Sequence, residues 1–343
     1  MREPAVPPLT HLLTLTNDKG IIEHARGAIP HPKLGYCTDD AGRALGLMSV
    51  LPSTWATKRV AEVSLGFLEE AGAGERNFRL RRRADGSWSH DAPSDDATAR
   101  ALQGLASAAT VAPWADVRRR SCYLFADKAR GFESAYLRSN AHAVLAAAAI
   151  LEVEPRDRVA RALFNRAAAA LPWHFNFSFW PWPEARLSYS NALIPEAMMV
   201  AARERHDREG LKVALDLLTW LVDEESHGGH FSFTPVGGRG AGEPKPGFDQ
   251  QPIEAWAMAD AASRAFRLTG NRAWADVVRR AEHWFHRSND AAVPVADPVV
   301  GAGFDGLGPR GVNLNRGAES TLAYLATTWR GAQAQFLTGR STW

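Results

Sequence analysis

Cysteine is scarce in this chain of 343 residues, which contains only Cys37 and Cys122. Two cysteines are too few for a disulfide framework, and they lack the spacing of metal ligands. Long hydrophobic runs are also missing: no stretch of about 18 apolar residues occurs, and the N-terminus lacks the apolar core of a secretory signal. We therefore expect a protein of a reducing compartment, the cytoplasm, without a membrane span.

An excess of charge of one sign is lacking too. The chain has 40 Lys+Arg against 38 Asp+Glu, a net charge of +2, so no global field favours nucleic acid or an anionic membrane. The glycine-rich stretch 237–242 opens no strand-to-helix phosphate unit, and no nucleophile elbow surrounds a serine. His227-Gly-Gly-His230 has a spacing that suits a metal, but the sequence offers no third ligand. We expect neither a metal nor an organic cofactor.

What the chain does have is a polar motif that recurs six times, each time before an apolar stretch. Its first copy is residues 35–45, Gly-Tyr-Cys-Thr-Asp-Asp-Ala-Gly-Arg-Ala-Leu. The other copies are Asp95-Asp96-Ala-Thr-Ala-Arg100-Ala-Leu, Ser139-Asn140, Ser190-Asn191, Asp249-Gln250-Gln251 and Gly317-Ala318-Glu319. Each interval suits one helical hairpin and a loop, which indicates a repeat architecture.

Apolar residues at three- and four-residue spacing predict helices between the motifs. Inner helices, apolar almost all round as in 141–150, are expected to begin near 39, 96, 140, 190, 252 and 318. Outer helices with one charged face are expected at 56–71, 114–129, 156–170, 209–225 and 272–287, after a leading helix at 9–27. Six such hairpins predict an all-α fold, an (α/α)6 toroid of about twelve helices, in one domain spanning 1–343.

The long connections fall before the inner helices, at 72–94, 171–189, 226–250 and 288–316. In a ring of hairpins these loops lie at the end where the inner helices begin. Compact domains keep long loops mainly for binding or catalysis, so the site is expected at that end.

Paired acids are the strongest chemical signal. Asp39 and Asp40 stand side by side, and one helix cap needs only one acid. Two neighbouring carboxyls with separated pKa values provide the acid and the nucleophile or base that glycoside cleavage requires. The same chemistry is available at Asp95 and Asp96, and Glu254 lies in the first turn of the fifth inner helix, so all five are catalytic candidates. Capping is the structural alternative.

The candidate substrate-binding residues are aromatic or polar side chains near these motifs. Aromatic faces stack on sugar rings, and amides and charged groups bond hydroxyls. The set is Tyr36, Arg43, Trp88, Arg100, Asn140, Trp180, Trp182, Asn191, Asp249, Gln250, Gln251 and Glu319. Two alternatives stay open: the arginines bridge neighbouring acids, and the tryptophans of loop 171–184 form a small core beneath it.

Three of these segments also resemble a known family. Residues 35–45, 248–255 (Phe-Asp-Gln-Gln-Pro-Ile-Glu-Ala) and 313–323 (Asn-Leu-Asn-Arg-Gly-Ala-Glu-Ser-Thr-Leu-Ala) resemble motifs of a bacterial group in the six-hairpin glycosidase superfamily. That group is often encoded beside, or fused to, glycosyltransferases, so the resemblance implies an (α/α)6 toroid and a glycosyltransferase as partner. Similarity to six-hairpin endo-α-mannanases implies that Asp39 and Asp40 are nucleophile and acid/base. Ala41 and Asp95 depart from the group's usual Asn and Glu, which leaves open which acid pair is catalytic.

The sequence thus predicts a glycoside hydrolase of bacterial oligosaccharides or glycoconjugates, with mannosides and glucosides favoured. A second hypothesis is a non-catalytic glycan-binding or scaffold protein that assists a glycosyltransferase. A third is a sugar epimerase or isomerase on the same fold, for which His142 or His174 would be the base.

Overall fold

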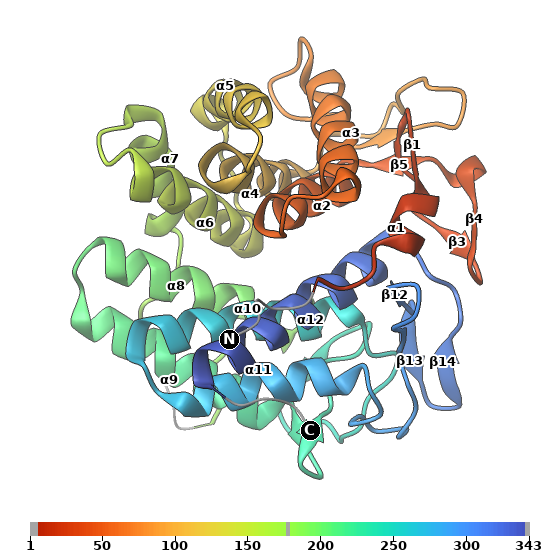
Figure 1. Ribbon diagram of the computed structural model, residues 1–343. Helices are drawn as coiled ribbons and strands as arrows, with labels where there is room; N and C mark the ends of the chain where they lie inside the picture. The colour runs from red at the N-terminus through yellow and green to blue at the C-terminus, as the bar shows by residue number, and fades with distance from the viewer. Residues whose placement is uncertain (1–5, 176–178, 340–343) are drawn as a thin grey trace. The chain divides into compact units, whose positions relative to one another are not determined.

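Helices dominate the computed structural model, which describes residues 6–175 and 179–339 (Figure 1). The chain divides into two units: the N-terminal unit is Leu9–Leu171, and the C-terminal unit is Pro172–Trp343 together with Met1–Pro8. A single domain for 1–343 stays a prediction. Among the described residues, no helix is long and apolar enough to cross a membrane.

The N-terminal unit has two layers of helices (Figure 1). Neighbouring inner helices pack against one another, each packs against the outer helix that follows it, and the outer helices pack in turn. The inner helices are α2 (Thr38–Val50), α4 (Asp95–Val111) and α6 (Leu137–Val153). The outer helices are α3 (Trp55–Gly72), α5 (Ala115–Gly131) and α7 (Arg158–Ala169).

The C-terminal unit repeats the hairpin plan. Its inner helices are α8 (Leu193–Glu204), α10 (Pro252–Thr269) and α12 (Ala318–Thr338), and its outer helices are α9 (Arg208–Glu224) and α11 (Arg272–Trp284). Helix α10 packs against both α8 and α12. With α1 (Thr10–Leu15), the described residues contain twelve α-helices, as the sequence predicts.

One glycine contact sets the spacing of α2 and α4. A Cβ on Gly104 would lie 2.1 Å from the carbonyl oxygen of Gly42, and a Cβ on Gly42 would lie 2.8 Å from the Cα of Ala101. Because the two backbones approach this closely, neither position tolerates a side chain. The acid pairs at the starts of α2 and α4 therefore lie on two helices that pack closely against each other.

The loops carry short antiparallel strand pairs that the sequence does not predict. The pairs are β1 (Thr16–Asn17) with β2 (Gly20–Ile21), β3 (Ala25–Arg26) with β4 (Ile29–Pro30), β5 (Tyr36–Cys37) with β6 (Arg81–Arg82), β7 (Arg186–Leu187) with β10 (Arg239–Gly240), β8 (Ser226–His227) with β9 (His230–Phe231), β11 (Ala296–Asp297) with β12 (Ala302–Gly303), and β13 (Gly306–Gly308) with β14 (Gly311–Asn313). A 3₁₀ turn, η1 (Pro32–Leu34), precedes β5.

The predicted leading helix at 9–27 is wrong beyond its first turns. Helix α1 ends at Leu15, and two strand pairs occupy most of residues 16–30. Gly20 (φ +144°) and Gly27 (φ +58°) adopt backbone conformations that a right-handed helix cannot contain. The turn glycines of this segment therefore outweigh the helical spacing of its apolar residues.

Candidate functional site

The two aspartates of the first motif lie in the first turn of α2. Thr38 begins the helix, and the residue before it, Cys37, is extended and provides no side-chain cap. The Thr38 amide donates to the carbonyl of Leu80 at 3.0 Å, which fixes the start of α2 against the segment that leads into β6. Asp39 and Asp40 therefore follow the N-cap and are not themselves caps, although the helix dipole favours their charge.

Arg43 bridges both acids from the next turn of α2. Its Nη1 lies 2.8 Å from Asp40 Oδ1 and 3.1 Å from Asp39 Oδ2. The Asp40 side chain is only 4% exposed, whereas that of Asp39 is 23% exposed and also accepts a hydrogen bond from the Cys37 thiol. The bridging role considered for Arg43 is thus present, and Asp39 is the acid of the pair that reaches solvent.

Asp39 and a residue that the sequence did not single out, Glu23, have pKa values shifted in opposite directions. Burial raises the pKa of Asp39, but the Arg43 charge and the Cys37 hydrogen bond outweigh it and lower the pKa below its ordinary value. Burial raises the pKa of Glu23, the Asp39 charge raises it further, and the opposing charge of Arg81 does not cancel them. Asp39 therefore ionises more readily than an ordinary aspartate, and Glu23, whose carboxylate accepts a hydrogen bond from Arg81, ionises less readily than an ordinary glutamate.

Cys37 is a protonated thiol that donates a hydrogen bond to Asp39. Burial first, and then the negative charge of Asp39, raises the pKa of Cys37 well above its ordinary value. The protonated sulfur can therefore donate to the Asp39 carboxylate. Both cysteines of the chain are free.

The second acid pair is arranged differently at the start of α4. Ser94 caps the helix by accepting from the Ala97 amide, so neither aspartate is the cap. Asp95 is half-buried, and Asp96 Oδ2 accepts from Arg100 Nε at 2.9 Å. Burial opposes ionisation of Asp96, but the Arg100 charge and its hydrogen bond hold the pKa of Asp96 far below the ordinary value. Asp96 is a firmly ionised partner of Arg100.

Helix α6 contributes a buried histidine to the same group of charges. His142 Nδ1 lies 2.5 Å from Gln103 Oε1 on α4, and its Nε2 has no hydrogen-bond partner among the described residues. Burial, together with the Arg100 charge, lowers the pKa of His142 well below its ordinary value, so the ring is neutral. Asn140 lies inside the helix and donates from Nδ2 to the carbonyls of Ser134 and Tyr136 at 2.9 and 3.0 Å.

The aromatic candidates of the N-terminal unit are packed side chains. Tyr36 is 2% exposed, and its hydroxyl accepts from Asn17 Nδ2 at 2.8 Å. Trp88 is half-buried, with the guanidinium groups of Arg79 and Arg82 at 5.7 and 5.8 Å from its ring centroid. A sugar-stacking role for either stays a prediction.

Glu254 is a buried residue of α10 whose carboxylate binds the turn before α8. One carboxylate oxygen accepts from the Ser190 amide, and the other accepts from the amide and Nδ2 of Asn191 at 3.1 and 3.2 Å. Ser190 has φ +46°, so the turn before α8 needs such support. The catalytic role of Glu254 and the binding role of Asn191 stay predictions, but these contacts give both residues a structural one.

We expect Glu254→Ala to lower the free energy of unfolding by about 3 kcal/mol, because it leaves the donors of residues 190 and 191 without their charged acceptor. The exposed Asp249→Ala is the matched control, with an expected change within about 0.5 kcal/mol. Urea denaturation followed by circular dichroism measures both. Equal stabilities of the two variants would contradict this structural role of Glu254.

The other polar candidates of the C-terminal unit are spread over buried and exposed positions. Gln250 is fully buried, Gln251 and Glu319 are half-buried, and Asp249 is exposed. Gln250 is also part of the backbone bridge to Leu307, so it fixes the loop before α10 against β13. Glu225, which the sequence did not single out, is buried and accepts from the amide and hydroxyl of Thr234.

The tryptophans of loop 171–184 pack on α9, although residues 176–178 of this loop lie outside the described residues. Trp182 is 4% exposed and stacks on Trp220 with ring centroids 6.0 Å apart. Trp180 meets Trp220 edge to face at 5.2 Å and donates from Nε1 to the Glu184 carbonyl at 2.9 Å. These contacts favour the small aromatic core, and sugar stacking by Trp180 and Trp182 stays a prediction.

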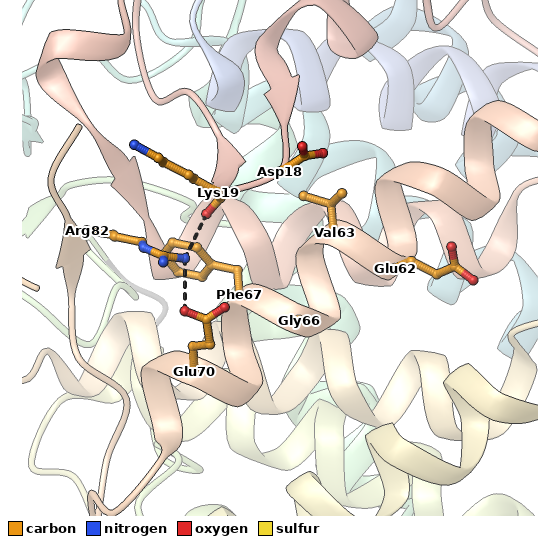
Figure 2. Close-up of a pocket in the computed structure, with 8 residues that line it drawn as sticks. All are labelled: Asp18, Lys19, Glu62, Val63, Gly66, Phe67, Glu70 and Arg82. Atoms are coloured by element: carbon orange, nitrogen blue, oxygen red, sulfur yellow. Dashed lines mark hydrogen bonds and ion pairs between the residues drawn. The ribbon is translucent and has the colours of Figure 1, made fainter. Parts of the chain in front are cut away.

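A hollow of about 250 Å³ on α3 is lined by none of the predicted site residues, although Phe67 and Arg82 of its lining contact Trp88 (Figure 2). Figure 2 shows Arg82 reaching between the backbone oxygen of Lys19 and the carboxylate of Glu70, at 3.4 and 3.0 Å. Charged side chains of both signs line it, and of these Arg82 and Glu70 pair with one another.

The chain resembles known proteins in its structure, whereas comparison of its sequence finds no match. No protein-family model matches the chain, and no curated protein matches it. Cellobiose 2-epimerase from Bacillus thermoamylovorans is similar in structure with a TM-score of 0.68 at 12% identity, covering 96% of both chains. Cellobiose 2-epimerase from Spirochaeta thermophila has a TM-score of 0.66 at 13% identity, covering 96% of this chain and 94% of that one.

An α-1,6-mannanase from Salegentibacter is also similar. It has a TM-score of 0.61 at 12% identity, covering 95% of this chain and 96% of that one. That structure is an inactive variant with two consecutive aspartates replaced by alanine, in complex with α-1,6-mannotetrose. At these identities the likeness shows the fold alone, and the predicted (α/α)6 fold is confirmed.

Proposed function

We propose that this protein is a glycoside hydrolase in which Asp39 acts as an anion and Glu23 as an acid. The observation that carries the proposal is the setting of Asp39: it is partly exposed, Arg43 and the Cys37 thiol hold its carboxylate, and its charge raises the pKa of Glu23 while its own pKa is lowered. Glycosidic cleavage needs one protonated carboxyl for the leaving oxygen and one ionised carboxylate for the sugar cation or its attacking water. The structural likeness to an α-mannanase supports a carbohydrate substrate, with mannosides first.

The neighbouring residues have positioning roles in this proposal. Arg43 and the Cys37 thiol hold the Asp39 carboxylate, while the largely buried Asp40 balances Arg43. The mannanase variant supports the importance of such a pair, since two consecutive aspartates are missing from that inactive enzyme. The proposal keeps Asp39 from the predicted pair and gives the role of the acid to Glu23, because Asp40 is 4% exposed and bonded to Arg43. A catalytic role for Asp40, Asp95 or Asp96 stays a prediction.

A panel of α- and β-linked manno- and gluco-oligosaccharides tests the proposal. Wild-type protein is expected to release new reducing ends from at least one member, and Glu23→Gln and Asp39→Asn are expected to release almost none from it. A panel on which wild type and both variants are equally inactive removes the support for hydrolysis.

The pKa shifts predict a bell-shaped pH profile of kcat/KM. The acid limb reflects protonation of Asp39 and lies below its ordinary pKa of 3.8, because that pKa is lowered. The alkaline limb reflects loss of the proton from Glu23 and lies above its ordinary pKa of 4.5, because that pKa is raised. Initial rates measured from pH 3 upward on the responsive substrate locate the alkaline limb and show whether the acid limb lies below pH 3.8. Glu23→Gln should remove the alkaline limb, and an unchanged alkaline limb in that variant excludes Glu23 as the acid.

A sugar epimerase or isomerase is the second candidate, favoured by His142. Its neutral ring has an Nε2 without a partner among the described residues, as a base that removes a proton next to a carbonyl requires. Two cellobiose 2-epimerases and a D-mannose isomerase are similar in fold. This activity would change one sugar into its isomer without new reducing ends, and His142→Gln would abolish it while Glu23→Gln would not.

A further inference from the structure

The hairpin β8–β9 holds two histidines opposite one another on its two strands in the C-terminal unit. Gly228 (φ +57°) and Gly229 (φ +87°) form its two-residue turn, a backbone shape that glycine adopts readily. His227 and His230 are therefore cross-strand partners, with ring centroids 6.2 Å apart. The sequence showed this pair but no third ligand.

The third group comes from the loop between α11 and α12, sixty residues further along the chain. Asp290 Oδ1 lies 3.0 Å from His230 Nε2 and 3.2 Å from His227 Nδ1. One ligand atom from each of the three residues lies within 4.8 Å of the other two. The Asp290 side chain is 2% exposed, whereas His227 is 49% exposed, so the group is open to solvent on one side.

The spacing of these atoms matches a tetrahedral metal ion. Bonds of about 2.0–2.1 Å in a tetrahedron place ligand atoms about 3.3 Å apart. Two of the three separations are already close to that value. Two imidazoles and a carboxylate are a ligand set for zinc, with water in the fourth position.

An outer contact also orients the carboxylate. Gln250 Nε2 donates to Asp290 Oδ2 at 2.6 Å, which directs Oδ1 towards the histidines. Gln250 itself is fixed by Trp284 Nε1, which donates to its Oε1 at 3.2 Å. Gln250 lies two residues before α10, so whatever binds Asp290 also restrains the start of that helix.

We propose that His227, His230 and Asp290 bind a divalent transition-metal ion, zinc by preference, that fastens the β8–β9 hairpin to the α11–α12 loop. The site restrains the loop before α10 through Gln250. The competing arrangement is a metal-free one, in which the imidazoles bond Asp290 directly. This proposal does not depend on the reaction that the protein catalyses.

Zinc titration of the full chain, without a histidine tag and after treatment with EDTA, tests the site. Competition with a chromophoric chelator is expected to give one zinc per chain, and one equivalent of zinc is expected to raise Tm where magnesium does not. Cobalt should give the intense visible absorption of a four-coordinate ion.

Variants assign the binding to these residues. His227→Ala, which changes a half-exposed side chain, and Asp290→Asn should each weaken zinc binding by at least about 100-fold. His90→Ala, an exposed histidine of the N-terminal unit, is the matched control and should bind like wild type. Absence of stoichiometric zinc binding in the wild type, or binding that survives both variants, overturns the proposal.

Discussion

Asp39→Asn is expected to lower kcat/KM on the responsive oligosaccharide by at least about 1,000-fold, because the amide cannot act as an anionic nucleophile or base. The fold should survive, since asparagine still offers an oxygen to Arg43 and Arg43 keeps its contact with Asp40. Initial rates give the loss of activity, and Tm measures the fold.

Asp95→Asn is the matched control for this variant. It makes the same chemical change in the first turn of the neighbouring inner helix, at an acid for which we assign no catalytic role. Its kcat/KM should remain within about threefold of wild type. Similar losses in Asp95→Asn and Asp39→Asn would move the reaction away from the pair Asp39 and Glu23.

The largest expected loss of stability is for Trp284→Ala, about 4 kcal/mol in the free energy of unfolding. Trp284 is fully buried at the end of α11, and its ring meets Phe233 and Phe285 edge to face at 5.5 and 5.2 Å. Its removal leaves a cavity and takes the donor away from Gln250 Oε1. Guanidinium denaturation measures the loss.

Trp55→Ala provides the comparison, because Trp55 is 72% exposed at the start of α3. Its expected change is within about 0.5 kcal/mol. If the two tryptophan variants were equally stable, Trp284 would not be the packing centre that its contacts indicate.

The inner helices were predictable because their sequence signals are local. Residues 141–150 are apolar except for His142, and they lie within α6, which is buried for most of its length. Pro252 occupies the first position of α10, where a missing backbone N–H costs nothing. Such signals placed the inner helices to within a few residues.

The strand pairs were not predictable in the same way. Strands of two or three residues are too short for an alternating pattern, so only their turn glycines leave a trace. The apolar spacing of the segment that contains Glu23 predicts helix instead, so the sequence does not indicate a role for this carboxyl. Its approach to Asp39 depends on the pairing of β5 and the bridge from Ile22 to Tyr36, which no local pattern predicts.

The roles of the acidic residues were also not predictable from the sequence alone. Doubled aspartates drew attention to Asp39 and Asp40, but the sequence could not show that one Arg43 pairs with both and buries Asp40. It likewise could not show that both oxygens of Glu254 are taken by the turn before α8. Asp290 is 60 residues from His230 and 63 from His227, so the tertiary structure was needed to bring it to them as well.

Leaving-group dependence in Glu23→Gln tests the central claim most directly. A dinitrophenyl glycoside needs no proton on its leaving oxygen, whereas a natural oligosaccharide of the same sugar does. We predict that Glu23→Gln lowers kcat/KM at least about 100-fold on the oligosaccharide but less than about 10-fold on the dinitrophenyl glycoside. Equal losses on the two substrates, or no cleavage of either by the wild type, would contradict a hydrolase that uses Glu23 as its acid.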